Sequence, residues 1–158
     1  MIAEDLKVTL PSDTEIVMTR EFDAPRRIVW KAMNDPDLIP RWWGPRKYET
    51  VVEYMDFRVG GKWRFLNVGA DGQTFGFSGE YLEIVEPEKV VQTMGFDGVP
   101  GEVGRNTVRL TERDGRTLIT ETSVFSSKAA RDAMIASGME SGARETYERL
   151  AELIATLK

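Results

Sequence analysis

Hydrophobic and polar residues alternate over residues 14–23, and one side of this segment carries Ile16, Met18, Arg20 and Phe22. Because successive side chains of a strand point to opposite faces, this two-residue period predicts a β-strand. The same period returns over residues 48–125, where turns rich in Gly, Pro and Asp divide the chain into about six further strands. The clearest turn, Asp114-Gly115, predicts a hairpin between the last two strands.

Three other segments follow the period of a helix. Residues 25–34 begin with a proline, which suits a first helical turn, and residues 35–43 predict a second, short helix that ends at Gly44-Pro45. Residues 127–157 predict a long C-terminal helix that Gly138 divides. Beyond this glycine, apolar residues recur at helical spacing at Met139, Ala143, Tyr147, Leu150, Ile154 and Leu157.

This order of elements predicts one α+β domain, residues 14–158, after an N-terminal lead-in of residues 1–13. We expect an antiparallel sheet of about six to seven strands, with two short helices after the first strand. One helix cannot cover so wide a sheet if the sheet is flat. The sheet should therefore bend around the C-terminal helix and enclose space between the two.

The chain contains no histidine and no cysteine. This excludes disulfides, Cys/His zinc sites and catalysis by Ser-His-Asp or Cys-His groups, and it is compatible with a cytoplasmic location. With 21 basic and 26 acidic residues the net charge is −5, so no nucleic-acid partner is expected. No apolar stretch has the length of a membrane span and no basic run favours a membrane surface, so no membrane partner is expected either.

We also expect no metal and no other cofactor. The stretch Gly60-Gly61-Lys62 lacks the spacing of a phosphate-binding loop, and the turn at Asp71 lacks the ligand series of a calcium loop. A chelator should therefore leave the melting temperature unchanged, which thermal unfolding with and without EDTA would check. A decrease of several degrees would contradict this, because a metal bound only to the folded state stabilises it by mass action.

Four stretches carry a resemblance to a known family: REFDAPRRIVWKAMNDPDLIPRWWGP, DFRVGGKWRF, SGEYLEIVEPEKVVQT and ASGMESGARETYERLAELI. They resemble the helix-grip domains of the START-like (SRPBCC) superfamily, and within it the family named for the activator of the heat-shock-protein-90 ATPase. The resemblance implies a bent sheet that grips the C-terminal helix, with a cavity between them. It does not imply co-chaperone activity, because the eukaryotic activator adds an N-terminal domain for which 158 residues leave no room. We therefore expect no chaperone partner.

Aromatic residues and methionines gather on single faces of the predicted strands. If these faces point toward the C-terminal helix, the residues would line a pocket for a small molecule, together with a few polar groups. Gly79 and Gly142 would leave room for the ligand. The candidate ligand-binding residues of this kind are Trp63, Phe65, Phe75, Phe77, Tyr81, Met94, Phe96, Met139 and Tyr147, with Asn67 and Gln92 as further polar groups. The alternative is that the same residues fill the interior as an ordinary core.

Trp42 and Trp43 are adjacent at the end of the second predicted helix and complete the apolar candidates. Neighbouring residues of a helix point about 100° apart, so the two indoles should occupy different environments. We expect one tryptophan to complete the core and the other to border the cavity. The alternative is that both pack against the sheet.

Two charged residues fall on apolar faces of predicted strands. Arg20 is in phase with Ile16 and Met18, and Glu121 is in phase with Ile119. A charge in such a place is unfavourable unless it is paired or hydrated. Arg20 and Glu121 are therefore candidates for orienting a ligand or for acid–base chemistry, and the alternative is a twist that turns either side chain to solvent.

Three functions fit these observations. The first is binding of an apolar or aromatic small molecule, as a carrier or sensor, between the sheet and the C-terminal helix. The second is a cyclase- or hydrolase-like enzyme that uses Glu, Tyr or Arg in the same cavity, and the third is a chaperone-interaction module. A cavity with one buried carboxylate favours an enzyme, a dry apolar cavity favours a binder, and a filled core favours an interaction role.

Overall fold

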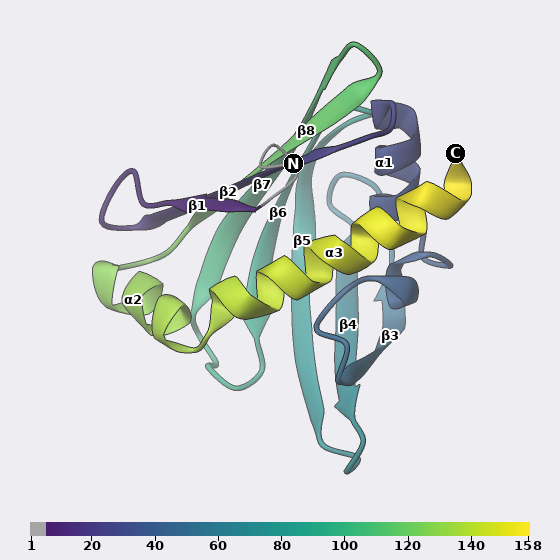
Figure 1. Ribbon diagram of the computed structural model, residues 1–158. Helices are drawn as coiled ribbons and strands as arrows, with labels where there is room; N and C mark the ends of the chain where they lie inside the picture. Colours follow the sequence, from purple (N-terminus) through teal and green to yellow (C-terminus); the bar gives the residue numbers. More distant parts are fainter. Residues whose placement is uncertain (1–5) are drawn as a thin grey trace.

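An eight-stranded antiparallel sheet is the frame of the protein in the computed structural model, which describes residues 6–158. The strand order is β1-β2-β8-β7-β6-β5-β4-β3. The sheet bends around helix α3 (Met139–Leu157), which crosses its inner face (Figure 1). The strands are β1 (Lys7–Thr9), β2 (Glu15–Phe22), β3 (Tyr48–Met55), β4 (Lys62–Gly69), β5 (Thr74–Val85), β6 (Lys89–Phe96), β7 (Val103–Arg113) and β8 (Arg116–Val124).

This arrangement confirms the predicted α+β helix-grip fold, although the sheet has more strands than expected. The additional strand, β1, lies in the expected lead-in and pairs with β2 through Val8 opposite Met18. A strand of three residues is too short to show an alternating pattern. Leu6, just before it, is buried in the core, and residues 1–5 of the expected lead-in lie outside the described part of the chain.

Pairing between β2 and β8 brings the second strand of the chain beside the last one. Phe22 lies opposite Thr117 at one end of this pair, and Glu15 lies opposite Val124 at the other. Where the chain leaves β2, the buried hydroxyl of Thr117 donates to the carbonyl of Ala24 at 2.7 Å. This hydrogen bond fixes the start of the following helix against the last strand.

The helical segments are α1 (Arg26–Asn34), η2 (Ile39–Arg41), α2 (Lys128–Ala136) and α3. The second short helix, expected over residues 35–43, is corrected to the single 3-10 turn η2. Asp35 and Pro36 begin the segment as a helix would, with the side chain of Asp35 accepting the N–H of Asp37 at 2.9 Å. Pro40, however, has no backbone N–H to donate to the carbonyl of Pro36, so an α-helix cannot continue through this segment.

The core lies between α3 and the inner face of the sheet. Gly138, with φ of +86°, turns the chain between α2 and α3. Helix α3 then buries Tyr147, Leu150, Leu153 and Ile154. These residues belong to one hydrophobic cluster with Phe22, Trp63 and Ile119 of the sheet. No helix within residues 6–158 is both long and apolar enough to cross a membrane.

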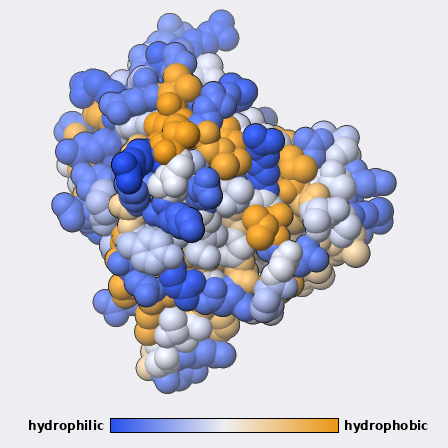
Figure 2. All heavy atoms as spheres, turned by 180° about the vertical axis from the view of Figure 1, so that it is seen from behind, coloured by the Kyte–Doolittle hydropathy of each residue, from blue (hydrophilic) through white to orange (hydrophobic). Residues whose placement is uncertain are grey.

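The outer face of the sheet shows hydrophobic groups interrupted by hydrophilic ones (Figure 2). Arg64 on β4 forms ion pairs there with Glu53 at 2.9 Å and with Asp97 at 2.6 Å. A Cβ atom at Gly76, on the adjacent strand β5, would lie 2.3 Å from Asp97 Oδ2. The glycine therefore leaves room for a network of charges that joins β3, β4 and the end of β6.

Candidate functional site

The loop between α1 and β3 places the two tryptophans in different environments. Trp42 is 6% exposed, and its indole N–H donates to the carbonyl of Ala32 at 2.8 Å. Trp43 is half-buried, and its ring meets Phe65 and Phe77 edge-on at centroid distances of 5.3 and 5.2 Å. These three residues, Trp43, Phe65 and Phe77, are termed the aromatic wall.

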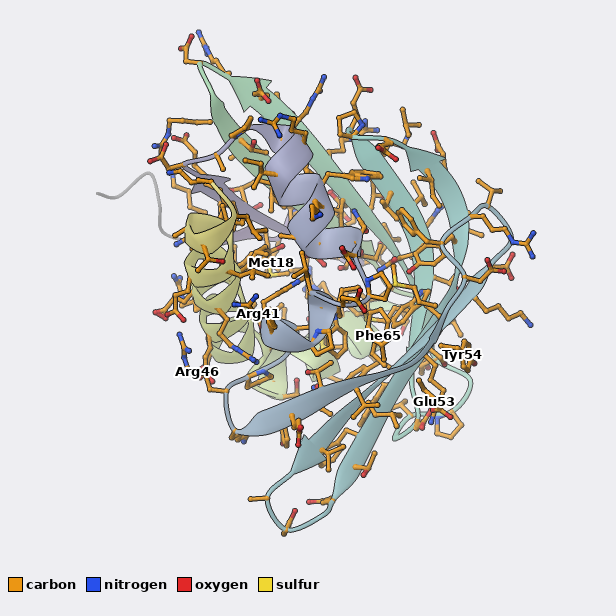
Figure 3. The ribbon with its side chains drawn as sticks, turned by 90° about the vertical axis from the view of Figure 1, so that its right-hand side faces the viewer. Met18, Arg41, Arg46, Glu53, Tyr54 and Phe65 are labelled. Atoms are coloured by element: carbon orange, nitrogen blue, oxygen red, sulfur yellow. The ribbon has the colours of Figure 1, made fainter. Side chains whose placement is uncertain are left out.

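Hydrogen bonds from α3 hold this loop in place. Gly44, with φ of +88°, reverses the chain after the tryptophans, and a Cβ atom there would lie 2.8 Å from Asn67 Oδ1. From α3, Arg149 donates to the carbonyls of Gly44 at 2.7 Å and Arg41 at 3.1 Å. Figure 3 shows Arg41 and Arg46 of the loop beside α3, and Arg46 forms an ion pair with Glu152 of this helix. The side chain of Thr50 on β3 donates to the carbonyl of Trp43, so the loop is attached to both the sheet and α3.

A cavity of about 320 Å³ lies between α3, the loop and the inner face of the sheet. In Figure 3, Met18 and Phe65 lie on the inner side of the sheet, whereas Glu53 and Tyr54 lie on its outer side. The candidate residues that line the cavity are Trp42, Trp43, Phe65, Phe77, Tyr81, Met94, Glu121, Met139 and Tyr147. The fold therefore brings most of the sequence-derived candidates together around one space.

Trp63 lies outside the cavity lining, which corrects the expectation for this residue. Its indole is 1% exposed and contacts Phe65 at a centroid distance of 4.8 Å. A Cβ atom at Gly79, directly opposite on β5, would lie 2.8 Å from Trp63 Nε1. Trp63 therefore occupies the space that Gly79 was expected to leave for a ligand.

Phe75, Phe96 and Arg20 also lie outside the lining. Phe96 lies opposite Phe77 on the neighbouring strand β6 and stacks on it at 5.0 Å, and Phe75 stacks on Phe96 at 6.2 Å. The guanidinium of Arg20 lies over the ring of Phe22, 4.6 Å from its centroid, and donates to the backbone carbonyl of Glu21 at 3.1 Å. The expectation that these three candidates face the cavity is corrected accordingly.

Glu121, on β8, takes part in a set of hydrogen bonds at the cavity. Its Oε1 accepts a hydrogen bond from the hydroxyl of Tyr147, and its Oε2 accepts one from Asn106 Nδ2 at 2.9 Å. Asn106 Nδ2 also donates to Ser123 Oγ at 3.1 Å, and Gln92 Nε2 approaches Asn106 Oδ1 to 3.5 Å. Glu121, Tyr147, Asn106 and Gln92 all line the cavity and are termed the Glu121 cluster.

The tyrosine of this cluster is held in its neutral form. Burial raises the pKa of Tyr147 well above its usual value, the carboxylate of Glu121 raises it further, and the charge of Arg20 lowers it. Burial also raises the pKa of Tyr81, the other tyrosine in the lining. Both hydroxyls therefore stay protonated at neutral pH, and Tyr147 acts as a donor to Glu121.

One row of the lining, on β7, was not among the candidates predicted from the sequence. Asn106, Val108 and Leu110 all face the cavity and occur at every second position, as an inward strand face requires. This alternation was a usable signal, but the row has no aromatic residue and resembles an ordinary core strand. The polar residue Asn106, 4% exposed, was the informative exception within it.

A surface hollow on α3 differs from this cavity. A hollow of about 400 Å³ lies against the residues Glu140, Ser141, Arg144, Glu145 and Glu148. All of them belong to α3, so this hollow is a groove on one helix rather than an enclosed space. In the described part of the chain, no three acidic side chains are grouped to hold a metal ion. The cavity beneath α3 is therefore the candidate functional site.

Solved structures share this fold along nearly their whole length. A protein from Arthrobacter aurescens, determined by solution NMR, is 29% identical, with a TM-score of 0.87 over 95% of this chain and 91% of that one. A crystal structure from Rhodobacter sphaeroides is 25% identical, with a TM-score of 0.89 over 98% of this chain and 100% of that one. A crystal structure from Mycobacterium smegmatis is 27% identical, with a TM-score of 0.84 over 93% of this chain and 94% of that one.

The family assignment follows from the sequence. No curated protein is significantly similar to the chain. The family model described as Activator of Hsp90 ATPase homolog 1-like protein, however, matches residues 23–155. This range begins at the end of β2 and includes the loop with both tryptophans, strands β3 to β8 and nearly all of α3. The chain therefore belongs to the Activator of Hsp90 ATPase homolog 1-like protein family.

Proposed function

We propose that the protein binds an apolar, partly aromatic small molecule in the cavity beneath α3, as a carrier or sensor in the cytoplasm. The observation that carries this proposal is the unfilled interior, where about 320 Å³ remain between α3 and the sheet. Small-molecule sites typically enclose about 300–1,000 Å³ and combine mostly apolar side chains with a few polar groups. The cavity matches both the size and the composition.

The lining is suited to a ligand of this kind. The aromatic wall supplies rigid apolar surface, and Met18, Met55 and Met94 supply flexible surface that can adapt to a bound molecule. Covering about 300 Å² of apolar ligand surface contributes about 7 kcal/mol. Loss of the ligand's freedom of motion opposes this by several kcal/mol, so we expect micromolar affinity without specific polar contacts.

Ala143→Leu tests whether the cavity takes up a ligand. Ala143 lies on α3 and lines the cavity, so leucine at this position fills part of the open space. We expect this variant to bind the neutral dye N-phenyl-1-naphthylamine about tenfold or more weakly than the wild type, as measured by fluorescence titration. The melting temperature should change by less than about 2 °C, because the added methyl groups enter empty space.

Ala155→Leu is the matched control, because Ala155 is exposed on the same helix. It should leave the dye affinity and the melting temperature unchanged. Absence of saturable dye binding to the wild-type protein would refute the proposal. A loss of about 1–3 kcal/mol in the unfolding free energy of Ala143→Leu would also contradict it, because overpacking of a filled interior has that effect.

An enzyme in the same cavity is the second candidate, because Glu121 places a carboxylate in the lining. A carboxylate there can accept a proton from a bound molecule. Binding is favoured because both oxygens of Glu121 already accept hydrogen bonds from the protein, and Tyr147 is held as a neutral donor. Turnover would appear as time-dependent loss of a cavity ligand in mass spectrometry, in the wild type but not in Glu121→Gln.

A further inference from the structure

Glu121 is the one charged side chain among the described residues that line the cavity. The other lining residues are apolar, or polar and neutral. A ligand inside the cavity therefore meets a single negative charge in surroundings where electrostatic interactions are stronger than in water. Such a charge favours a cationic group on the ligand and disfavours an anionic one.

The hydrogen-bond donors beside this carboxylate already donate to other groups of the protein. The hydroxyl of Tyr147 donates to Oε1 of Glu121, and Asn106 Nδ2 donates to Glu121 at 2.9 Å and to Ser123 at 3.1 Å. An ionised carboxylate has about four lone-pair sites, so each oxygen of Glu121 can accept a further hydrogen bond. Tyr147 and Asn106 thus fix the carboxylate in position and leave acceptors, rather than their own donors, for the ligand.

Arg20 supplies an opposing charge near the cavity, and this charge lowers the pKa of Tyr147, whose hydroxyl donates to Glu121. The carboxylate of Glu121 lines the cavity, whereas the guanidinium does not. Arg20, on the neighbouring strand β2, lies outside the lining, over the ring of Phe22 and in a hydrogen bond to the carbonyl of Glu21. The aromatic wall lines the same cavity, and the faces of aromatic rings attract cations. The carboxylate and the rings therefore favour the same class of ligand.

We propose that the cavity selects apolar or aromatic amines, whose protonated nitrogen donates to the carboxylate of Glu121 while the apolar body contacts the aromatic wall. This inference rests on the proposed function and adds to it the polar group of the ligand. Glu121 is the residue that contacts this group, and Tyr147 and Asn106 are positioning residues that hold its carboxylate.

Matched ligands can isolate the polar group. Near neutral pH, 1-naphthylmethylamine is cationic, 1-naphthalenemethanol is neutral and 1-naphthoate is anionic, and all carry the same ring system. In competition with N-phenyl-1-naphthylamine, we expect the amine to bind the wild type about tenfold or more tightly than the carboxylate, with the alcohol between them. In Glu121→Gln, the advantage of the amine over the carboxylate should fall below about threefold.

Glu148→Gln is the control for net charge. Glu148 is exposed on α3, so its replacement removes the same charge from a position outside the cavity. This variant should keep the full advantage of the amine. If the amine has no advantage in the wild type, or keeps it in Glu121→Gln, the inference is wrong although the proposed function stands. The wild-type ranking tests the inference even if Glu121→Gln does not fold. If neither the dye nor any naphthalene ligand binds the wild type, the proposed function fails as well.

Discussion

Gly79→Ala is expected to lower the unfolding free energy by about 3 kcal/mol or more. A Cβ atom at this position would lie 1.8 Å from the backbone carbonyl oxygen of Thr93 and 2.8 Å from Trp63 Nε1. The carbonyl belongs to β6, the strand paired with β5, and it cannot move aside without disturbing the hydrogen bonds between these strands. Urea denaturation followed by circular dichroism would measure the loss.

Gly95→Ala is the matched control on the neighbouring strand. A Cβ atom at Gly95 would meet its nearest neighbour at 3.6 Å, which is ordinary van der Waals contact, and the backbone there has no positive φ. Because alanine restricts the unfolded chain more than glycine, we expect a change between no effect and a gain of about 1 kcal/mol. Equal losses in the two variants would show that the contact with Thr93 is not the reason for glycine at position 79.

The same glycine shows where the sequence pattern stops being informative. Alternation along β5 places Gly79 on the inner face with Phe77 and Tyr81, and the pattern alone favoured open space beside it. The space is occupied because Trp63 lies directly opposite on β4. The residue that lies opposite a given position on the neighbouring strand depends on the register of the two strands. Alternation within one strand carries no information about this register.

The predicted fold was accurate where the periodic signal was long. Strand β2, the hairpin of β7 and β8 about Asp114-Gly115, and the division of the C-terminal helix at Gly138 all follow from local patterns. The prediction missed β1 and made the second helix too long. Three residues cannot show a period, and Pro40 interrupts the helical hydrogen bonds of the second helix, which is reduced to the turn η2.

The candidate site was predictable in outline because aromatic rows mark the inner face of the sheet. Phe65 and Phe77 line the cavity, but Trp63 and Phe75, two residues away on the same faces, do not. The cavity covers only part of each face, and its position depends on the bend of the sheet and on the loop after α1. The pairing of β7 with β8, which brings Asn106 beside Glu121, likewise required the register.

Trp42→Ala is expected to lower the unfolding free energy by about 3–5 kcal/mol. The indole is almost completely buried, and its removal also leaves the carbonyl of Ala32 without the hydrogen bond that it accepts at 2.8 Å. For a domain of this size, such a loss corresponds to a decrease of about 6–20 °C in the melting temperature, measured by thermal unfolding. At temperatures below the lowered melting temperature of the variant, dye binding should persist, because the truncation enlarges the cavity and leaves the aromatic wall in place.

Trp43→Ala should have the opposite balance of effects. Its indole is half-buried, so the lost burial corresponds to about 2 kcal/mol or less, but the variant removes one member of the aromatic wall. We therefore expect a smaller decrease in melting temperature than for Trp42→Ala and a larger loss of dye affinity. If Trp43→Ala were the less stable variant, or if it bound the dye as the wild type does, Trp43 would be a core residue and the two adjacent indoles would serve one purpose. The expected contrast would show instead that one tryptophan supports the fold and its neighbour supports the site.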